Sequence, residues 1–142
     1  MSDKVFIDTN ILIYAHLTNE AKKHKVALDL LRNTLTSSNI WISIQVLSEF
    51  YVAMGKYKCE HEQIAEYISA MTKRMNVLPL ALATVEKALL IKSKYQFSYW
   101  DSLILSAALE CECGIVYSED LTHNQVIEDS LTVINPFVVT TT

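Results

Sequence analysis

Hydrophobic positions recur along this chain with two different spacings. Short apolar runs rich in β-branched and aromatic residues predict buried strands, at residues 4–8, 40–42, 77–78, 115–117 and 131–135. Between these runs, apolar residues recur every three or four positions, as they do on one face of a helix. This second spacing predicts helices over residues 20–36, 43–57, 64–75, 85–95 and 99–113, the last of them ended by Gly114.

The alternation of short strands with helices points to one fold class. Strands that are apolar throughout, and separated by helices, are typical of a mainly parallel sheet covered on both faces. A chain of 142 residues is long enough for one core of this kind, and it contains no repeat, linker or low-complexity segment. We therefore expect a single α/β domain over residues 1–142.

Composition narrows the class of protein further. Hydrophobic residues make up 51% of the chain, which has only two glycines and two prolines, so a compact globule rich in helix is expected. No apolar run approaches the roughly 18 residues that a membrane span needs, and the first residues do not read as a signal peptide. The three cysteines form neither a disulfide framework nor a zinc pattern. A reduced, cytoplasmic setting fits this composition best.

The charge of the chain does not identify its substrate. A formal net charge of −4 weakly disfavours a nucleic-acid binder that works by bulk attraction. Basic residues are nevertheless clustered, and such clusters are usually solvated helix faces. They lie at Lys22, Lys23, Lys25 and Arg32, at Lys56 and Lys58, and at Lys73 and Arg74.

Acidic residues follow two of the predicted strands. Asp8 stands directly behind the first strand, and open α/β sheets bind their ligands at the carboxyl ends of strands. Glu119 and Asp120 follow the strand at 115–117, which is expected at the same edge of the sheet. Each also has a purely structural interpretation, because Asp is a favoured helix N-cap and polar residues suit a turn.

Two further acids, Glu49 and Asp101, lie on predicted helices. Glu49 is on the apolar stripe of its helix, and Glu is almost never fully buried without a partner. A cation or a lysine is therefore expected to meet it. Asp101 has a structural alternative, because the segment SYWD at 98–101 resembles a capping box whose acid complements the helix dipole.

Taken together, the acids favour a site for a hard cation. Carboxylates without a matching cluster of Cys or His are ligands for Mg²⁺ or Mn²⁺. One or two such cations activate water and stabilise the leaving oxygen when a phosphodiester is hydrolysed. The four histidines are too widely spaced to suggest a zinc site instead.

The order of these residues resembles that of the PIN domain, and most closely that of the VapC-type toxins of bacterial and archaeal toxin–antitoxin pairs. The resemblance covers nearly the whole chain and rests on VFIDTNI at 5–11, on residues 43–49, on YWDSLI at 99–104, and on YSEDL at 117–121 with His123 and the NPF at 135–137. Each motif is short, but their order and spacing are specific. One departure is Asn124, where related toxins often have Gly; Asn tolerates positive φ, so the turn is expected to be kept.

The resemblance implies roles for particular residues. The metal-binding acids of the family carry over onto Asp8, Glu49, Asp101 and Asp120. Asp120 is preferred to Glu119 because the family pattern reads Ser or Thr, any residue, then Asp. Asn10 and Ser118 match polar positions that support the metal site.

The same resemblance implies a fold and an activity. The expected fold is a PIN-like α/β/α sandwich around a mainly parallel sheet of about five strands, with the acids in a cleft at its carboxyl edge. The expected activity is Mg²⁺- or Mn²⁺-dependent endonucleolytic cleavage of RNA. A cognate antitoxin is expected to inhibit the enzyme by placing an arginine near Asp8 and Asp101, and homodimers are expected because they are frequent in the family.

Two other functions compete with this interpretation. Phosphatases of the haloacid dehalogenase type also begin with an apolar strand and an Asp, but they need a second acid two residues later, where this chain has Asn10. A non-catalytic module could use the same cleft to bind RNA or protein. The intact set of acids favours the enzyme.

Overall fold

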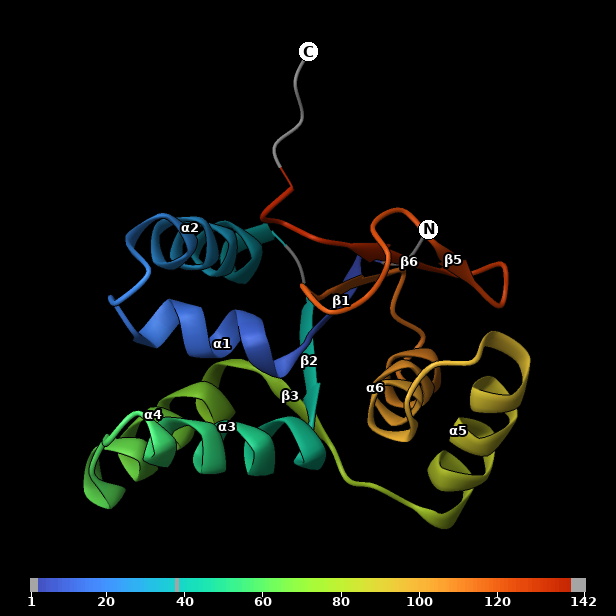
Figure 1. The fold of residues 1–142 in the computed structure, drawn as a ribbon, viewed down its shortest axis with the longest axis horizontal. Helices are drawn as coiled ribbons and strands as arrows, with labels where there is room; N and C mark the ends of the chain where they lie inside the picture. Colours follow the sequence, from blue (N-terminus) through green and yellow to red (C-terminus); the bar gives the residue numbers. More distant parts are fainter. Residues whose placement is uncertain (1–2, 38, 139–142) are drawn as a thin grey trace.

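The computed structural model describes residues 3–37 and 39–138, so residues 1–2 and 139–142 of the expected 1–142 domain lie outside the described residues, as does residue 38. Within the described part, strands and helices alternate as the sequence predicts (Figure 1). The strands are β1 (Lys4–Ile7), β2 (Asn39–Ser43), β3 (Asn76–Leu78), β4 (Ile115–Tyr117), β5 (Val126–Ile127) and β6 (Leu131–Ile134). The helices are α1 (Thr9–His16), α2 (Ala21–Ser37), α3 (Ile44–Lys56), α4 (His61–Arg74), α5 (Leu82–Tyr95) and α6 (Tyr99–Glu110).

The strands form one sheet in the order β3-β2-β1-β4-β6-β5. The five strands from β3 to β6 run parallel, with Val5 opposite both Ile40 and Ile115, which confirms the predicted mainly parallel sheet of about five strands. The sixth strand, β5, pairs antiparallel to β6. It spans two residues, which is too short to give a pattern in the sequence.

Helices cover both faces of this sheet and make it the middle of three layers. In Figure 1, α1 to α4 lie to the left of β2, and α5 and α6 lie to its right. This division follows from the strand order, because the chain moves outward from β1 to β2 and β3 and then returns past β1 to reach β4. Crossovers between parallel strands are right-handed, so a reversal of direction moves the connecting helices to the other face. The α/β/α sandwich is therefore confirmed.

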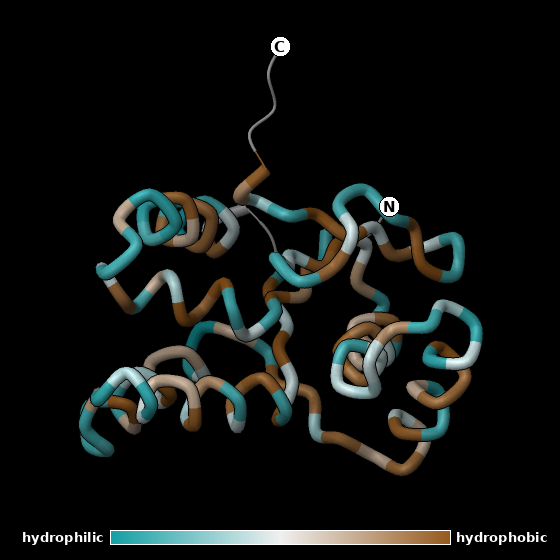
Figure 2. Tube along the Cα trace, viewed as in Figure 1, coloured by the Kyte–Doolittle hydropathy of each residue, from teal (hydrophilic) through white to brown (hydrophobic). Residues whose placement is uncertain are grey.

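Burial on both faces explains why the strands are apolar throughout. Phe6 and Ile7 of β1 and Val116 of β4 are completely buried. Figure 2 shows hydrophobic residues along the strands and a mixture of hydrophobic and hydrophilic residues around the helices. Within the described residues, no helix is both long enough and apolar enough to cross a membrane.

Two local features differ from the sequence-based expectation. Helix α6 ends at Glu110 and not at residue 113, because Glu112 adopts a left-handed conformation (φ 60°) and the N–H of Cys113 donates to Ala108 O over 3.0 Å. This is a Schellman closure with Glu112, and not Gly114, in the left-handed position. Helix α1, for which the sequence pattern gave no bounds, starts immediately behind Asp8.

The strand order creates a crevice at one place on the carboxyl edge of the sheet. The chain leaves β1 towards β2 on one side, and its later return places β4 on the other side. Such a reversal opens a crevice beyond the carboxyl ends of the two strands, where open α/β sheets bind ligands. The N–H of Asp8, directly behind β1, donates to Tyr117 O at the end of β4 over 3.0 Å. Residues that follow β1 and β4 are therefore adjacent.

Candidate active site

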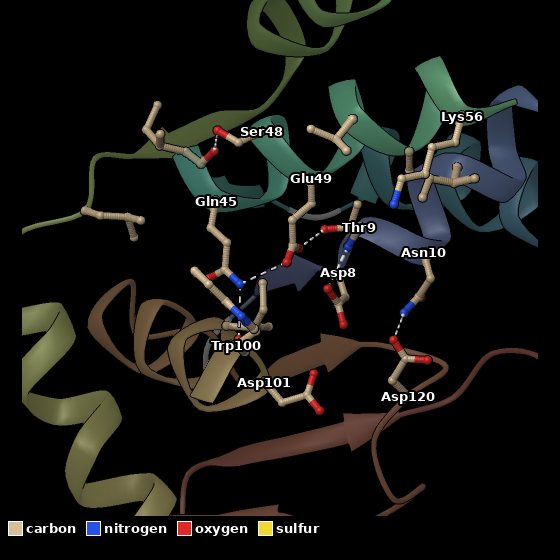
Figure 3. Close-up of a pocket in the computed structure, with 16 residues that line it drawn as sticks. Asp8, Thr9, Asn10, Gln45, Ser48, Glu49, Lys56, Trp100, Asp101 and Asp120 are labelled. Atoms are coloured by element: carbon tan, nitrogen blue, oxygen red, sulfur yellow. Dashed lines mark hydrogen bonds between the residues drawn. The ribbon is translucent and has the colours of Figure 1, made fainter. Parts of the chain in front are cut away.

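A cleft of about 690 Å³ opens at this crevice. Its walls are one face of α3 and the start of α6, and its floor is formed by residues that follow β1 and β4 (Figure 3). Sixteen residues line it. They include all four acids that the sequence singled out, namely Asp8, Glu49, Asp101 and Asp120.

Asp8 forms the floor of the cleft and is held on both of its carboxylate oxygens. One oxygen accepts a hydrogen bond of 2.7 Å from the N–H of Thr9, and the other accepts one of 2.7 Å from the hydroxyl of Ser118. Asp8 is also the N-cap of α1, and only 4% of its surface is exposed. The capping role and a place in the cleft, which the sequence analysis set against each other, therefore coexist in one side chain.

The surroundings of Asp8 disfavour its negative charge. Burial raises the pKa of Asp8 to about 7, and the negative charges of Asp120 and Glu49 add to the rise. The hydrogen bonds from Ser118 and Thr9 act in the opposite direction and lower the pKa. A cation in the cleft would relieve the same repulsion and favour the ionised carboxylate.

Glu49 projects from α3 towards Asp8, and neutral groups meet its carboxylate. Thr9 Oγ1 donates to Glu49 Oε1 over 2.7 Å, and Gln45 Nε2 donates to Glu49 Oε2 over 3.3 Å. Among the described residues, the hydrogen bonds to this carboxylate therefore come from a hydroxyl and an amide and not from a lysine, and a cation at Glu49 stays a prediction. Gln45 Nε2 also donates to Trp100 O over 3.1 Å, which ties α3 to the start of α6.

Asp101 lies in the first turn of α6, on the opposite wall. Ser98 caps this helix by accepting a hydrogen bond of 3.1 Å from the N–H of Asp101, as the capping box predicts. The carboxylate itself points into the cleft (Figure 3). Burial raises the pKa of Asp101, Ser98 lowers it, and the charges of Asp120 and Glu49 raise it further.

The exposed side chain of Asp120 completes the acidic set. Asn10 Nδ2 donates to Asp120 Oδ2 over 3.0 Å, and the N–H of Asp120 donates to Ser118 Oγ over 3.2 Å. Asn10 and Ser118 therefore contact the acids that the resemblance implied they would support.

Glu119, the neighbour of Asp120, is held outside the cleft. Its carboxylate accepts a hydrogen bond of 2.7 Å from the hydroxyl of Tyr14 and forms an ion pair with Lys23. Its N–H donates to Asn10 Oδ1 over 3.2 Å, so Asn10 fixes both residues of this loop. Asp120 therefore lines the cleft and Glu119 does not.

The cleft also contains residues that the sequence analysis did not identify. Thr9 and Gln45 hold Glu49 in place, and Trp100 and Lys56 line the cleft on opposite sides of Glu49 and Asp8 (Figure 3). The sequence could have pointed to Gln45, because residues four positions apart lie on the same face of a helix and Glu49 is four residues after Gln45. No sequence signal pointed to Thr9, whose hydroxyl reaches a helix that is forty positions away in the chain.

The acids share a cleft but do not form a closed metal cage. Within residues 3–37 and 39–138, no three His, Cys, Asp or Glu side chains are arranged so that they could together hold a metal ion.

The nearby turn has the geometry expected from the sequence, because Asn124 adopts a positive φ of 70°. His123 Nδ1 accepts a hydrogen bond of 3.0 Å from the N–H of Asn135.

Several solved structures with a similar fold are toxins or toxin–antitoxin complexes. A toxin–antitoxin complex from Klebsiella pneumoniae superposes with a TM-score of 0.71 at 19% identity, over 95% of this chain and 99% of that chain. VapBC2 from Rickettsia felis, bound to a DNA fragment from its promoter, gives 0.67 at 17% identity over 93% and 99%. The VapC20 toxin of Mycobacterium tuberculosis, which cleaves the sarcin–ricin loop, gives 0.63 at 17% identity over 79% and 86%.

Sequence comparison identifies the family directly. No curated protein sequence matches this chain significantly. The sequence profile of the PIN domain matches residues 5–128, which include all four acids of the cleft. The strand order, the cleft at the β1–β4 crevice and this match lead to the same conclusion: the chain belongs to the PIN domain family.

Proposed function

We propose that this protein is a Mg²⁺- or Mn²⁺-dependent endoribonuclease that acts in the cytoplasm as the toxin of a toxin–antitoxin pair. The observation that carries the proposal is that four carboxylates from four separate segments of the chain line one cleft. They are Asp8 behind β1, Glu49 on α3, Asp101 on α6 and Asp120 behind β4. Hard cations prefer such oxygen ligands, and cleavage of phosphodiesters is chemistry that they support.

The residues present fit a cation that keeps part of its water shell. Mg²⁺ is usually bound by one or two carboxylates together with several waters, so it does not need a closed protein cage. This mode of binding is compatible with the lack of a three-residue cluster among the described residues. Asp8, Glu49, Asp101 and Asp120 would hold the ion, directly or through its waters.

The protein's own groups would fix the acids in position for this work. Thr9 and Ser118 orient Asp8, Gln45 orients Glu49, and Asn10 orients Asp120. A bound cation would supply the activation of water and the stabilisation of the leaving oxygen. Burial raises the pKa of Asp8 to about 7. Where Asp8 is protonated, binding of the cation would therefore displace the proton from its carboxyl group.

An antitoxin is the partner that we propose for this chain. The support comes from structures with the same fold, several of which are complexes of a toxin with its antitoxin. An antitoxin arginine placed between Asp8 and Asp101 would compete with the cation, since its planar fork matches carboxylates. A homodimer is the assembly expected from the family resemblance.

The phosphatase alternative is disfavoured by what Asn10 does. An aspartate-nucleophile phosphatase would need an acid at this position to act as a proton donor and acceptor. Asn10 instead donates a hydrogen bond to Asp120 and accepts one from the N–H of Glu119, so its side chain has a structural role. The non-catalytic module is kept as an outcome of the following test.

Cleavage of unstructured RNA by the purified protein tests the proposal. We expect cleavage with Mg²⁺ or Mn²⁺, none after exhaustive chelation, and a loss of at least a hundredfold in Asp8→Asn. The matched control is Asp29→Asn, which removes an exposed carboxylate of α2 outside the cleft and should leave the rate unchanged. Cleavage that survives chelation would contradict the metal-dependent mechanism. Wild-type protein that binds RNA but never cleaves it would identify a binding module.

A further inference from the structure

The cleft continues beyond the acids in two directions. Gln45 lies near one end of the cleft wall formed by α3, and Lys56 ends that helix at the other. At a rise of 1.5 Å per residue, the helix advances about 16 Å between them. Glu49 lies between these two residues, next to the floor of the cleft at Thr9. The cleft is therefore an elongated trough that extends past Glu49 in both directions along α3.

Trp100 lines the trough next to Gln45. Its backbone carbonyl accepts from Gln45, and its indole ring lies edge-on to Tyr99 with ring centroids 5.2 Å apart. Trp100 is 60% exposed, and the next residue, Asp101, belongs to the acidic set. Large aromatic rings are costly to leave in water, and an exposed aromatic side chain beside the proposed cleavage site is a surface on which a nucleobase can stack.

Lys56 lies at the opposite end of the trough and is the only cation among the described residues that line it. Figure 3 shows its ammonium group on the other side of Glu49 and Asp8 from Trp100. A lysine in the last turn of a helix also complements the helix dipole. That role does not require the side chain to reach the cleft, whereas contact with a phosphate group does.

We propose that Trp100 and Lys56 hold a single strand of RNA across the acids, with a base stacked on Trp100 and a backbone phosphate on Lys56. This inference rests on the proposed function and adds how the substrate is placed. A single strand is required, because the face of a base is available for stacking only when the base is unpaired. The stacking contact tolerates any base, so Trp100 positions the strand without reading its sequence.

Binding is tested separately from cleavage. A short fluorescein-labelled single-stranded RNA is titrated with protein in the Asp8→Asn background with Mn²⁺, and the RNA is checked on a gel for integrity. We expect Trp100→Ala and Lys56→Gln each to weaken binding about tenfold, within the range of single stacking and phosphate contacts. Trp100→Phe and Lys56→Arg should restore most of the affinity. The matched control is Lys58→Gln, which removes an exposed lysine two residues beyond Lys56 and outside the cleft.

Two further readouts exclude a merely structural effect. The chain has two tryptophans, Trp41 and Trp100. RNA that stacks on Trp100 should quench the tryptophan fluorescence of the parent protein but not that of Trp100→Phe. The Lys56→Gln variant should also have a shallower dependence of affinity on salt, since one phosphate contact is lost. Duplex RNA of the same sequence should bind more weakly than the single strand.

The outcomes separate this inference from the proposed function. If wild-type protein cleaves RNA while Trp100→Ala and Lys56→Gln bind as tightly as their parent, the inference is overturned and the nuclease stands. If no RNA is cleaved but both substitutions weaken binding, the inference stands and the nuclease is overturned. Absence of any RNA binding, or an equal loss in Lys58→Gln, would also overturn it.

Discussion

Ser118 donates its hydroxyl to Asp8 over 2.7 Å, although the two residues lie 110 positions apart in the chain. The contact joins the segment behind β4 to the segment behind β1, the two strands between which the crevice opens. It also lowers the pKa of Asp8, against the effect of burial, which raises it to about 7. One hydroxyl therefore both positions this carboxylate and favours its charged form.

Replacing Ser118 with Ala should raise the pKa of Asp8, because the charged carboxylate loses a hydrogen-bond donor. A proton would then compete more strongly with a cation, so the pH at which Mn²⁺ binding is half-maximal should move upward. The buried carboxylate oxygen would also be left unsatisfied, at a cost in stability of about 1–3 kcal/mol. Mn²⁺ titrations between pH 5 and 9 measure the shift. The exposed Ser130 provides the control, since Ser130→Ala should shift neither quantity.

The stability of the metal-free protein should depend on pH through Asp8. Its folded pKa of about 7 lies above the reference value of 3.8, so the folded state binds the proton more tightly than the unfolded state does. The folded protein therefore loses stability as pH rises from about 4 to 7, by a few kcal/mol at most, and the loss then levels off. Asp8→Asn keeps an N-cap side chain and removes the charge.

Thermal melts in EDTA at several pH values test this dependence. At pH 8 Asp8→Asn should be more stable than wild type, and the difference should shrink towards zero near pH 4. Asp101→Asn should act in the same direction, because the pKa of Asp101 is raised as well. A metal at about 100 times its dissociation constant adds about 2.7 kcal/mol to the wild type and should add less to either variant. Variants that are less stable than wild type at pH 8 would indicate that the carboxylates serve mainly as caps.

The ion pair between Lys23 and Glu119 should stabilise the loop that carries Asp120. Lys23 also lies over the ring of Tyr14, 4.9 Å from its centroid, so its removal loosens one contact of α2 with the loop and one with α1. Lys23→Met should lower the midpoint of urea denaturation more than Lys25→Met, which removes an exposed lysine of the same helix. Equal effects of the two substitutions would show that the loop does not depend on this pair.

Much of the fold was predictable because burial leaves a simple pattern. Strands covered on both faces are apolar throughout, so β1, β2 and β4 were visible as short runs, and parallel pairing then brings Asp8 and Asp120 to one edge. The helix α1 was harder to delimit, because Ile11 and Leu12 are both completely buried and their run lacks a clear polar face. The end of α6 at Glu110 was unpredictable for another reason, since the closing turn places Glu112 in the left-handed conformation, for which Glu has no intrinsic preference.

The acids were easier to locate than the groups that hold them. A carboxylate at a strand end or on an apolar helix stripe is conspicuous in a sequence, because such positions are buried and charged groups are seldom buried without a partner. The partners of these acids, such as Thr9 for Glu49, are ordinary polar residues from distant segments, and only the folded chain brings them together. The same holds for the ion pair that draws Glu119 away from Asp120, its neighbour in the sequence.

Mn²⁺ binding to the purified protein, measured by electron paramagnetic resonance, tests the central claim most directly. If Asp8, Glu49, Asp101 and Asp120 form one cation site, wild-type protein should bind Mn²⁺ saturably and release it to excess Mg²⁺. Neutralising any one acid, as Asn or Gln, should weaken binding at least tenfold, whereas Asp29→Asn should not. No saturable Mn²⁺ binding, or binding that survives all four substitutions, would contradict the account.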